Sequence, residues 1–190
     1  MRQFIIIWVL SITLIFGGET QLNNFYKLLN QDAIIRMDIN FSQKQFESSF
    51  NSSGSFYLID KLNYYYDSPS FKILASDSLI TTINYETNQV VYNSIDKRQL
   101  GVFDILSGNK NFIEFLDNKN NTYVNNFIVH ELGYSGFFEF DRETGTLKLI
   151  KLEISDSQII LIDIILIDVV KDYIKPDFDK NKFEIVDLRG

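Results

Sequence analysis

Apolar residues at every second position are the feature of this chain that most limits how it can fold. The segment 35–41 shows the pattern clearly, because charged or polar residues separate the apolar ones. Side chains of a strand point alternately to its two faces, so a period of two predicts a strand with one buried face. The apolar positions of this segment are Ile35, Met37, Ile39 and Phe41.

More segments of strand composition follow, separated by turn-forming sequences such as Asp67-Ser68-Pro69. The Ser- and Asn-rich stretch 48–54 is interpreted as a loop. A series of about ten strands predicts an antiparallel meander, and a sheet of that size tends to curl toward a barrel. The expected strands are residues 35–41, 54–60, 62–67, 71–75, 79–85, 89–94, 123–129, 134–140, 147–154, 158–168 and 183–186.

Two of these strands indicate how the sheet is shaped. In one, Leu147 and Leu149 share a face, whereas the apolar residues from 150 to 154 share the opposite face. A β-bulge or a strong bend produces such a change of phase, and bends curl a sheet. In the other, residues 158–170 are apolar on both faces, which predicts cover on both sides of that strand.

Three short segments have apolar residues at helical spacing instead. They are residues 21–31, residues 100–106 and residues 112–116, with Gly108 closing the second. If these helices lay across the open side of the curled sheet, they would close an apolar hollow. We therefore expect a mainly β domain with short helices.

The N-terminal residues have the composition of an export signal. Arg2 precedes an unbroken apolar run from Phe4 to Phe16, which is short for a bilayer span, and small residues follow it. We expect residues 1–20 to be a cleaved signal peptide and residues 21–190 to be one domain. An uncleaved membrane anchor is the alternative.

Composition argues against several classes of function. The net charge of −7 disfavours nucleic acid and anionic lipid surfaces as partners. The chain has no cysteine and a single histidine, His130, so it lacks the usual ligands of a zinc site and a cysteine for its own lipidation. No nucleophile elbow, phosphate loop or zinc-protease motif occurs. We expect no enzymatic activity, no cofactor and no metal.

The order of several weak motifs resembles a known family. These are MDINFSQKQF at 37–46, GSFYLIDKLNYYYDSPSFKILASDS at 54–78 and NYETNQVVYNSI at 84–95. They are followed by VFDIL at 102–106 and LKLIKLEISD at 147–156. Together they resemble the outer-membrane lipoprotein carrier protein family, LolA.

The resemblance implies a fold and a function. The fold is an unclosed antiparallel β-barrel with an α-helical lid. The function is that of a monomeric periplasmic carrier, which shelters the acyl chains of lipoproteins in an apolar cavity. It takes acylated lipoproteins from an inner-membrane ABC exporter and passes them to an outer-membrane lipoprotein receptor.

The resemblance also implies site residues. The family commonly has Arg-Pro after the strand that here reads FYLID, and that arginine is thought to latch the lid. Asp60 and Lys61 stand there instead, so either Asp60 caps a lid helix or Lys61 replaces the arginine. The expected cavity lining is Met37, Ile39, Phe41, Phe56, Leu58, Leu62, Tyr64 and Tyr66, and the expected lid residues are Phe25, Leu29, Leu100, Phe103 and Leu106.

Other interpretations stay open at the level of the sequence. A module of the same fold could bind or sense another envelope lipid or a partner protein without carrying lipoproteins. A hydrolase of envelope lipids would need clustered polar residues in the hollow, and the chain offers few of these. The interior could also be a solid core filled by the chain's own aromatic residues, in a purely structural domain.

Overall fold

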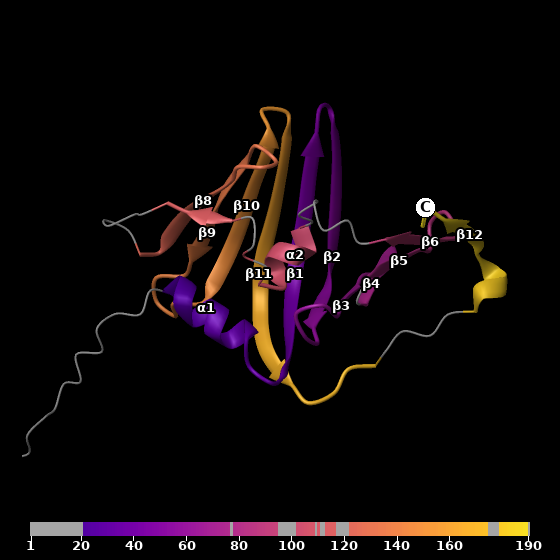
Figure 1. Ribbon diagram of the computed structural model, residues 1–190, viewed down its shortest axis with the longest axis horizontal. Helices are drawn as coiled ribbons and strands as arrows, with labels where there is room; N and C mark the ends of the chain where they lie inside the picture. Colours follow the sequence, from indigo (N-terminus) through magenta and orange to yellow (C-terminus); the bar gives the residue numbers. More distant parts are fainter. Residues whose placement is uncertain are drawn as a thin grey trace, which may run out of the picture.

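A single twelve-stranded sheet with two short α-helices makes up the computed structural model (Figure 1). The structure describes residues 21–76, 78–94, 102–108, 110, 113–116, 122–174 and 179–189. The predicted signal peptide and Leu100 lie outside these residues. The elements are α1 (Gln21–Leu29), β1 (Ile34–Gln45), β2 (Ser48–Leu58), β3 (Tyr64–Asp67), β4 (Phe71–Ser76), β5 (Leu79–Asn84), β6 (Gln89–Ser94), α2 (Val102–Leu106), β7 (Glu114–Phe115), β8 (Val124–Val129), β9 (Tyr134–Phe140), β10 (Leu147–Ser155), β11 (Gln158–Val170), the 3₁₀ turn η1 (Lys180–Lys182) and β12 (Glu184–Asp187).

The strands follow the order β12-β6-β5-β4-β3-β2-β1-β11-β10-β9-β8-β7. The strands β1 to β6 form one antiparallel meander, and β7 to β11 form another. The two meanders are joined by the pairing of β1 with β11, although β11 comes much later in the chain. All pairs are antiparallel except β12 with β6. Because β12 and β7 stand at opposite ends of the order, the sheet is not closed into a barrel. The predicted fold class, an unclosed antiparallel barrel with helices, is therefore confirmed.

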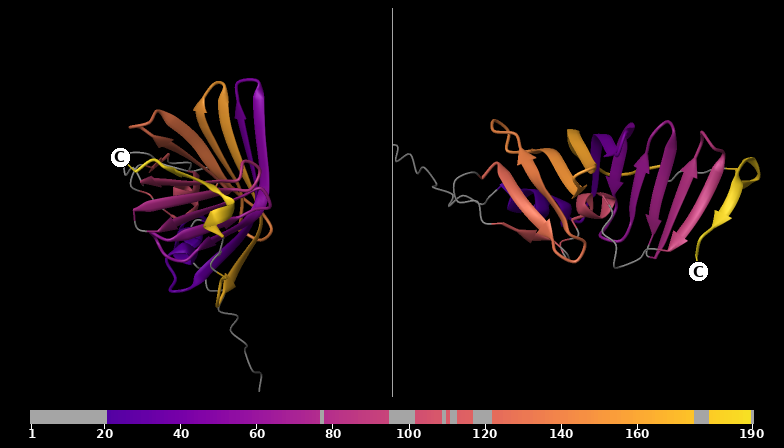
Figure 2. Two further views of the ribbon diagram at one scale, coloured as in Figure 1. Left: turned by 90° about the vertical axis from the view of Figure 1, so that its right-hand side faces the viewer. Right: turned by 90° about the horizontal axis from the view of Figure 1, so that it is seen from above.

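The sheet curves around one face, and α1 and α2 lie inside this concave face (Figure 2). Register shifts occur where β11 pairs with β1, with Ile165 as the extra residue, and where β10 pairs with β9, with Lys148 as the extra residue. Such bulges increase the local twist and bend of a strand. A bulge in residues 147–154 is therefore confirmed, but it lies at Lys148 and not after Leu149. Leu147 is buried together with Ile150 and Leu152, whereas Leu149 lies on the opposite face.

Two segments differ from the predicted secondary structure. Residues 48–54, expected to form a loop, are part of β2 and pair with β1 along the whole hairpin. Ladder hydrogen bonds join backbone groups, so serine and asparagine residues extend a strand when a long partner lies beside them. In the segment 112–116, where the apolar spacing predicts a helix, Glu114 and Phe115 form β7 and pair with β8.

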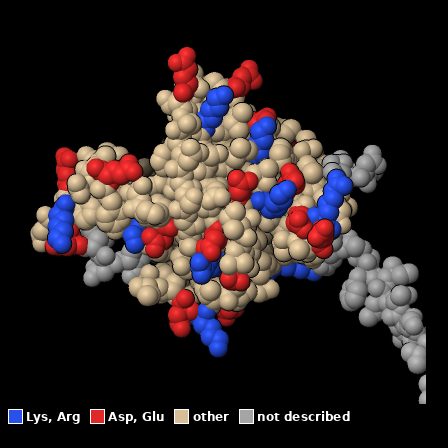
Figure 3. Space-filling model, turned by 180° about the vertical axis from the view of Figure 1, so that it is seen from behind, with Lys and Arg blue, Asp and Glu red and all other residues tan. Residues whose placement is uncertain are grey.

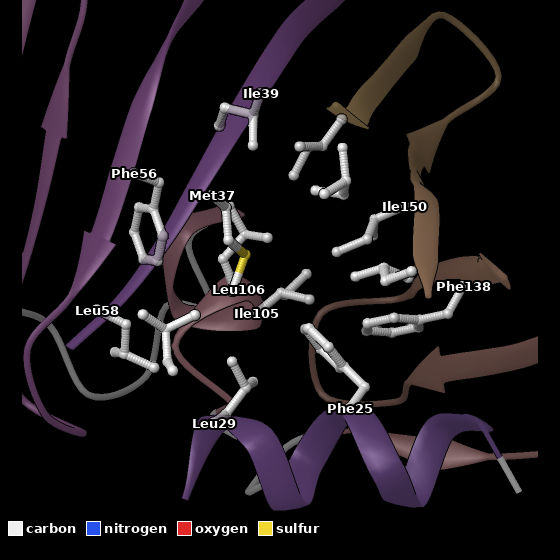
Figure 4. Packing of buried hydrophobic residues seen from close by; sticks show 14 of the residues in the cluster. Phe25, Leu29, Met37, Ile39, Phe56, Leu58, Ile105, Leu106, Phe138 and Ile150 are labelled. Carbon is white, nitrogen blue, oxygen red and sulfur yellow. The ribbon is translucent and has the colours of Figure 1, made fainter. Parts of the chain in front are cut away.

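The main core lies between the concave face and the two helices (Figure 4). Side chains of β1 and β2 meet those of β9, β10 and β11 there, under α1 and α2. On β11, Ile160, Ile162 and Ile164 are buried, but the outward-pointing Ile165 and Leu166 are 64% and 44% exposed. The prediction of cover on both faces of this strand is therefore wrong for the outer face, where the bulge turns Ile165 toward solvent.

The outer, convex face is covered in part by the chain between β11 and β12. Tyr173 packs against Tyr57, and the ring of Phe183 contacts that of Tyr85 at 5.6 Å. Buried residues of the same face, among them Tyr65 and Ile83, form a second apolar layer behind β3 to β6. Over the visible surface of this side, positive and negative side chains are interspersed without a large patch of one sign (Figure 3).

Candidate ligand-binding site

The floor of the concave face is built by three neighbouring strands. Their register places Met37 of β1 beside Phe56 of β2, and Phe56 beside Tyr66 of β3. The same strands bring Leu58 beside Tyr64 one pair further along. Six of the predicted lining residues are thus gathered on one buried apolar surface: Met37, Ile39, Phe56, Leu58, Tyr64 and Tyr66.

Of the other two predicted lining residues, Phe41 packs at the edge of this surface and Leu62 lies outside it. Phe41 is half-buried further along β1, where its ring contacts those of Phe50 and Phe103. Leu62 is 59% exposed in the loop between β2 and β3, so its assignment to the cavity is wrong. The alternating pattern extends back to Leu62 in the sequence, but β3 begins only at Tyr64.

One aromatic side chain of α2, that of Phe103, packs against three aromatic residues of the floor. The ring of Phe103 lies 5.1 Å from that of Tyr66, 5.7 Å from that of Phe56 and 6.0 Å from that of Tyr64, between centroids. Leu106 of the same helix is buried, as is its neighbour Ile105. Of the predicted lid residues on this segment, Phe103 and Leu106 therefore cover the floor.

Helix α1 covers the other half of the concave face. Phe25 and Leu29, both predicted lid residues, point into the core with Leu22 (Figure 4). The Phe25 ring lies 6.2 Å from that of Phe138 on β9. The helix is amphipathic, so its buried side is apolar while Lys27 remains exposed.

The two helices also contact each other. Gly108, which ends α2 with a φ of +82°, packs so closely on α1 that an added Cβ would lie 3.1 Å from Leu29 Cδ1. Glycine suits this position because it adopts positive φ readily and lacks a side chain. Beyond it, the Lys110 ammonium lies 3.5 Å from the centroid of the Tyr26 ring. Burial lowers the pKa of Lys110 and raises that of Tyr26.

The site offers hydroxyl groups but little reactive chemistry. Tyr66 and Ser52 share a hydrogen bond of 2.9 Å, whereas the buried Tyr26 hydroxyl has no partner in the described part of the chain. Burial raises the pKa of Tyr64, so its phenol is neutral at ordinary pH. His130 pairs with Glu114 at the exposed edge of the sheet, away from this floor.

The predicted latch has a different role in the structure. The Asp60 carboxylate accepts hydrogen bonds from the backbone N–H groups of Leu62 and Asn63, at 2.8 and 2.9 Å, and from the Asn63 side chain. Asp60 therefore stabilises its own turn, and in the described residues its hydrogen bonds all lie within that turn. Lys61 is exposed in the same loop.

Sequence reasoning missed several residues that complete the site. Leu22 and Tyr26 add to the cover from α1, and Ile105 adds to the cover from α2. The helical spacing of 21–31 could have assigned Leu22, since it shares a face with Phe25 and Leu29. Strands β9 and β10 close the far side of the core with Phe138, Phe140, Ile150 and Leu152.

The described residues show neither a metal centre nor a membrane-spanning helix. They contain no group of three or more acidic or histidine side chains that could hold a metal ion. Nor does any helix in the ranges given above have the length and apolar character needed to cross a membrane.

Comparison with known proteins gives structural similarity only. No protein-family model and no curated protein matches the sequence. An uncharacterized conserved protein from Thermus thermophilus superposes with a TM-score of 0.52 at 7% identity, over 90% of this chain and 97% of that one. At this identity the match shows a shared fold.

Two further solved structures are similar at lower scores. A LolA superfamily protein from Nitrosomonas europaea has 12% identity and a TM-score of 0.47, over 86% of this chain and 96% of that one. A DUF1329 family protein from Desulfovibrio piger has 10% identity and a TM-score of 0.45, over 80% and 94% of the two chains.

Proposed function

We propose that this chain is a periplasmic carrier that binds the acyl chains of lipoproteins beneath α1 and α2. The observation that carries the proposal is that two short helices cover the apolar floor of an unclosed sheet with their buried side chains. Helix α2 has five residues and α1 has nine, lengths at which an isolated helix is marginal in water. Their position therefore depends on the floor beneath them.

An acyl chain and the helices would compete for the same surface. The buried side chains of both helices pack against this floor, so a ligand that takes the same surface displaces at least one helix. Besides Tyr26, five buried apolar side chains hold the helices, at about 2 kcal/mol each, or on the order of 10 kcal/mol. An acyl chain of about fifteen CH₂ groups gains roughly 12 kcal/mol from burial. Such a near-balanced exchange makes uptake and release reversible.

The rest of the carrier proposal rests on the sequence. The apolar N-terminal segment would direct the chain to the periplasm. The family resemblance supplies the partners, which are an inner-membrane ABC exporter and an outer-membrane receptor. The carrier itself would do no chemistry, and the exporter would supply the energy for loading.

Photocrosslinking from the floor of the site tests the proposal. A photoreactive residue replacing Tyr64, which is buried beside Phe103, should capture acylated lipoproteins in the cell envelope. The same group at the exposed Leu62, two residues away, is the matched control and should capture far less. If Tyr64 captures only free phospholipids, the chain is a lipid-binding module without a carrier role. Capture of lipoproteins from Leu62 alone would contradict binding beneath the helices.

A further inference from the structure

A second feature, separate from the floor under α2, is a pocket of about 530 Å³ at the start of α1. It lies between α1 and the loop joining β9 to β10, and this loop supplies one wall with residues 142–146. Pockets that bind small molecules commonly measure about 300–1,000 Å³ and combine apolar walls with a few placed polar groups. We refer to it as the hairpin pocket.

The apolar wall of the hairpin pocket is the surface of the main core. Phe25 and Leu147 line it and are core residues, while Leu28 and Ile167 line it and pack against the core. The ring of Phe25, which lines the pocket, also contacts the rings of Phe138 and Phe140 in the core. An apolar chain starting in the pocket would therefore reach the interior by passing Phe25.

The polar wall contains an acceptor that lacks a partner. The side-chain oxygen Oε1 of Gln21 is buried and has no hydrogen-bond partner in the described residues. Its side chain is held against the loop, since an added Cβ at Gly145 would lie 3.6 Å from Gln21 Cγ. A buried acceptor without a partner is unfavourable, so a ligand that donates a hydrogen bond to Gln21, once its amide turns toward the pocket, removes that penalty.

The loop that faces Gln21 is fixed by its own hydrogen bonds. The Asp141 carboxylate accepts from the backbone N–H groups of Glu143 and Thr144 and from the Thr144 hydroxyl, at 2.8 to 3.0 Å. Gly145, at a φ of +70°, returns the chain to β10 and donates to the Asp141 carbonyl at 2.9 Å. These bonds shape the polar wall before any ligand arrives.

We propose that the hairpin pocket binds the polar head of an acylated ligand, a head whose hydroxyl or amide group donates a hydrogen bond to Gln21 Oε1. The acyl chain continues past Phe25 beneath α1. This inference rests on the proposed function, because it assigns the head of the same ligand. It makes Gln21 a residue that selects ligands by their head group, while the floor accepts any apolar chain.

Two ligands with the same chain and different heads test this inference. 1-Monodecanoylglycerol carries free hydroxyl groups, whereas methyl decanoate has no hydrogen-bond donor. Their affinities are measured below micellar concentrations by displacement of an apolar fluorescent dye. The protein should bind the glycerol ester roughly fivefold more tightly than the methyl ester, as expected for one hydrogen bond. Gln21→Leu should abolish this preference. Asn23→Leu is the matched control because Asn23 is an exposed residue of the same helix that does not line the pocket, and it should leave the preference unchanged.

The outcomes separate this inference from the carrier proposal. If the wild-type protein binds both esters equally, or if Gln21→Leu keeps the preference, the assignment of the pocket is overturned while acyl-chain binding stands. If neither ester displaces the dye, both the head-group site and acyl-chain binding are overturned.

Discussion

The Phe103 ring of α2 lies nearly parallel to the Phe56 ring of β2, with 8° between their planes and 5.7 Å between their centroids. This stacked pair attaches a five-residue helix to the middle of the sheet. Tyr64 and Tyr66 surround the same ring, so Phe103 is the aromatic anchor of this half of the cover. A ligand that takes the floor must displace it.

Phe103→Ala should lower the stability of the protein and raise its affinity for an apolar ligand. Loss of a half-buried phenylalanine should lower the free energy of unfolding by about 2 kcal/mol. Because α2 competes with the ligand, the same loss should raise the affinity for an apolar fluorescent probe by up to roughly thirtyfold. Ile174→Ala, at a residue 92% exposed, is the control and should change the free energy of unfolding by less than about 0.5 kcal/mol. Weaker probe binding by Phe103→Ala would show that Phe103 belongs to the ligand site itself.

Two tyrosine-to-phenylalanine variants should have opposite effects on stability. The buried Tyr26 hydroxyl lacks a hydrogen-bond partner among the described residues, so Tyr26→Phe should raise the free energy of unfolding by about 1 kcal/mol. Tyr66→Phe should lower it by a similar amount, because the Tyr66 hydroxyl shares a hydrogen bond with Ser52. Urea denaturation measures both values. A loss of stability in Tyr26→Phe would mean that this hydroxyl has a partner.

Single cysteines should report movement of the helices, since the chain has no cysteine of its own. Leu29→Cys on α1 should react slowly with a thiol reagent in the free protein and several-fold faster with acylated ligand present, because the ligand displaces α1. Met37→Cys on the floor should stay protected in both states, covered first by the helices and then by the ligand. If Leu29→Cys reacts with the thiol reagent at the same rate with and without ligand, the ligand does not displace α1.

Buried tyrosines should make the protein less stable at alkaline pH. Burial raises the pKa of Tyr65 to about 12 from an ordinary value near 10. Below pH 10 neither the folded nor the unfolded protein ionises this phenol; above it the unfolded chain loses the proton first. The free energy of unfolding should therefore fall as the pH rises from 10 to 12, and Tyr65→Phe should reduce that slope. An unchanged slope in Tyr65→Phe would contradict the raised pKa.

Two glycines, Gly54 in strand β2 and Gly133 in the turn between β8 and β9, should respond very differently to alanine. A methyl group at Gly54 would collide with the Asp67 carbonyl on β3, and a backbone atom there cannot move aside easily. Gly54→Ala should cost about 3 kcal/mol in the free energy of unfolding. At Gly133 nothing lies within 4 Å of an added Cβ, so Gly133→Ala should cost only about 1 kcal/mol, from its φ of +69°. Equal losses in the free energy of unfolding would show that the close approach of β3 does not restrict the side chain at residue 54.

The burial of apolar side chains was predicted well where they lie on regular elements. Alternation placed Met37, Ile39 and Phe56 on the buried face, and helical spacing placed Phe25 and Leu29 over it. It failed at Leu62, because the Asp60 turn holds that residue outside β3. The hairpin pocket could not be predicted, since it depends on the contact of Gln21 with a loop more than a hundred residues away.

The sequence alone determined that this chain forms a curled antiparallel sheet, which face of β1 and β2 is buried, and that β10 changes phase. These properties depend on the order of side chains within one segment. The tertiary structure decided that β1 pairs with β11, that the polar residues 48–54 extend β2, and that α1 and α2 meet at Gly108. Strand pairing uses backbone groups that all residues share, and the cover of the floor comes from distant segments, so no local pattern specifies either one.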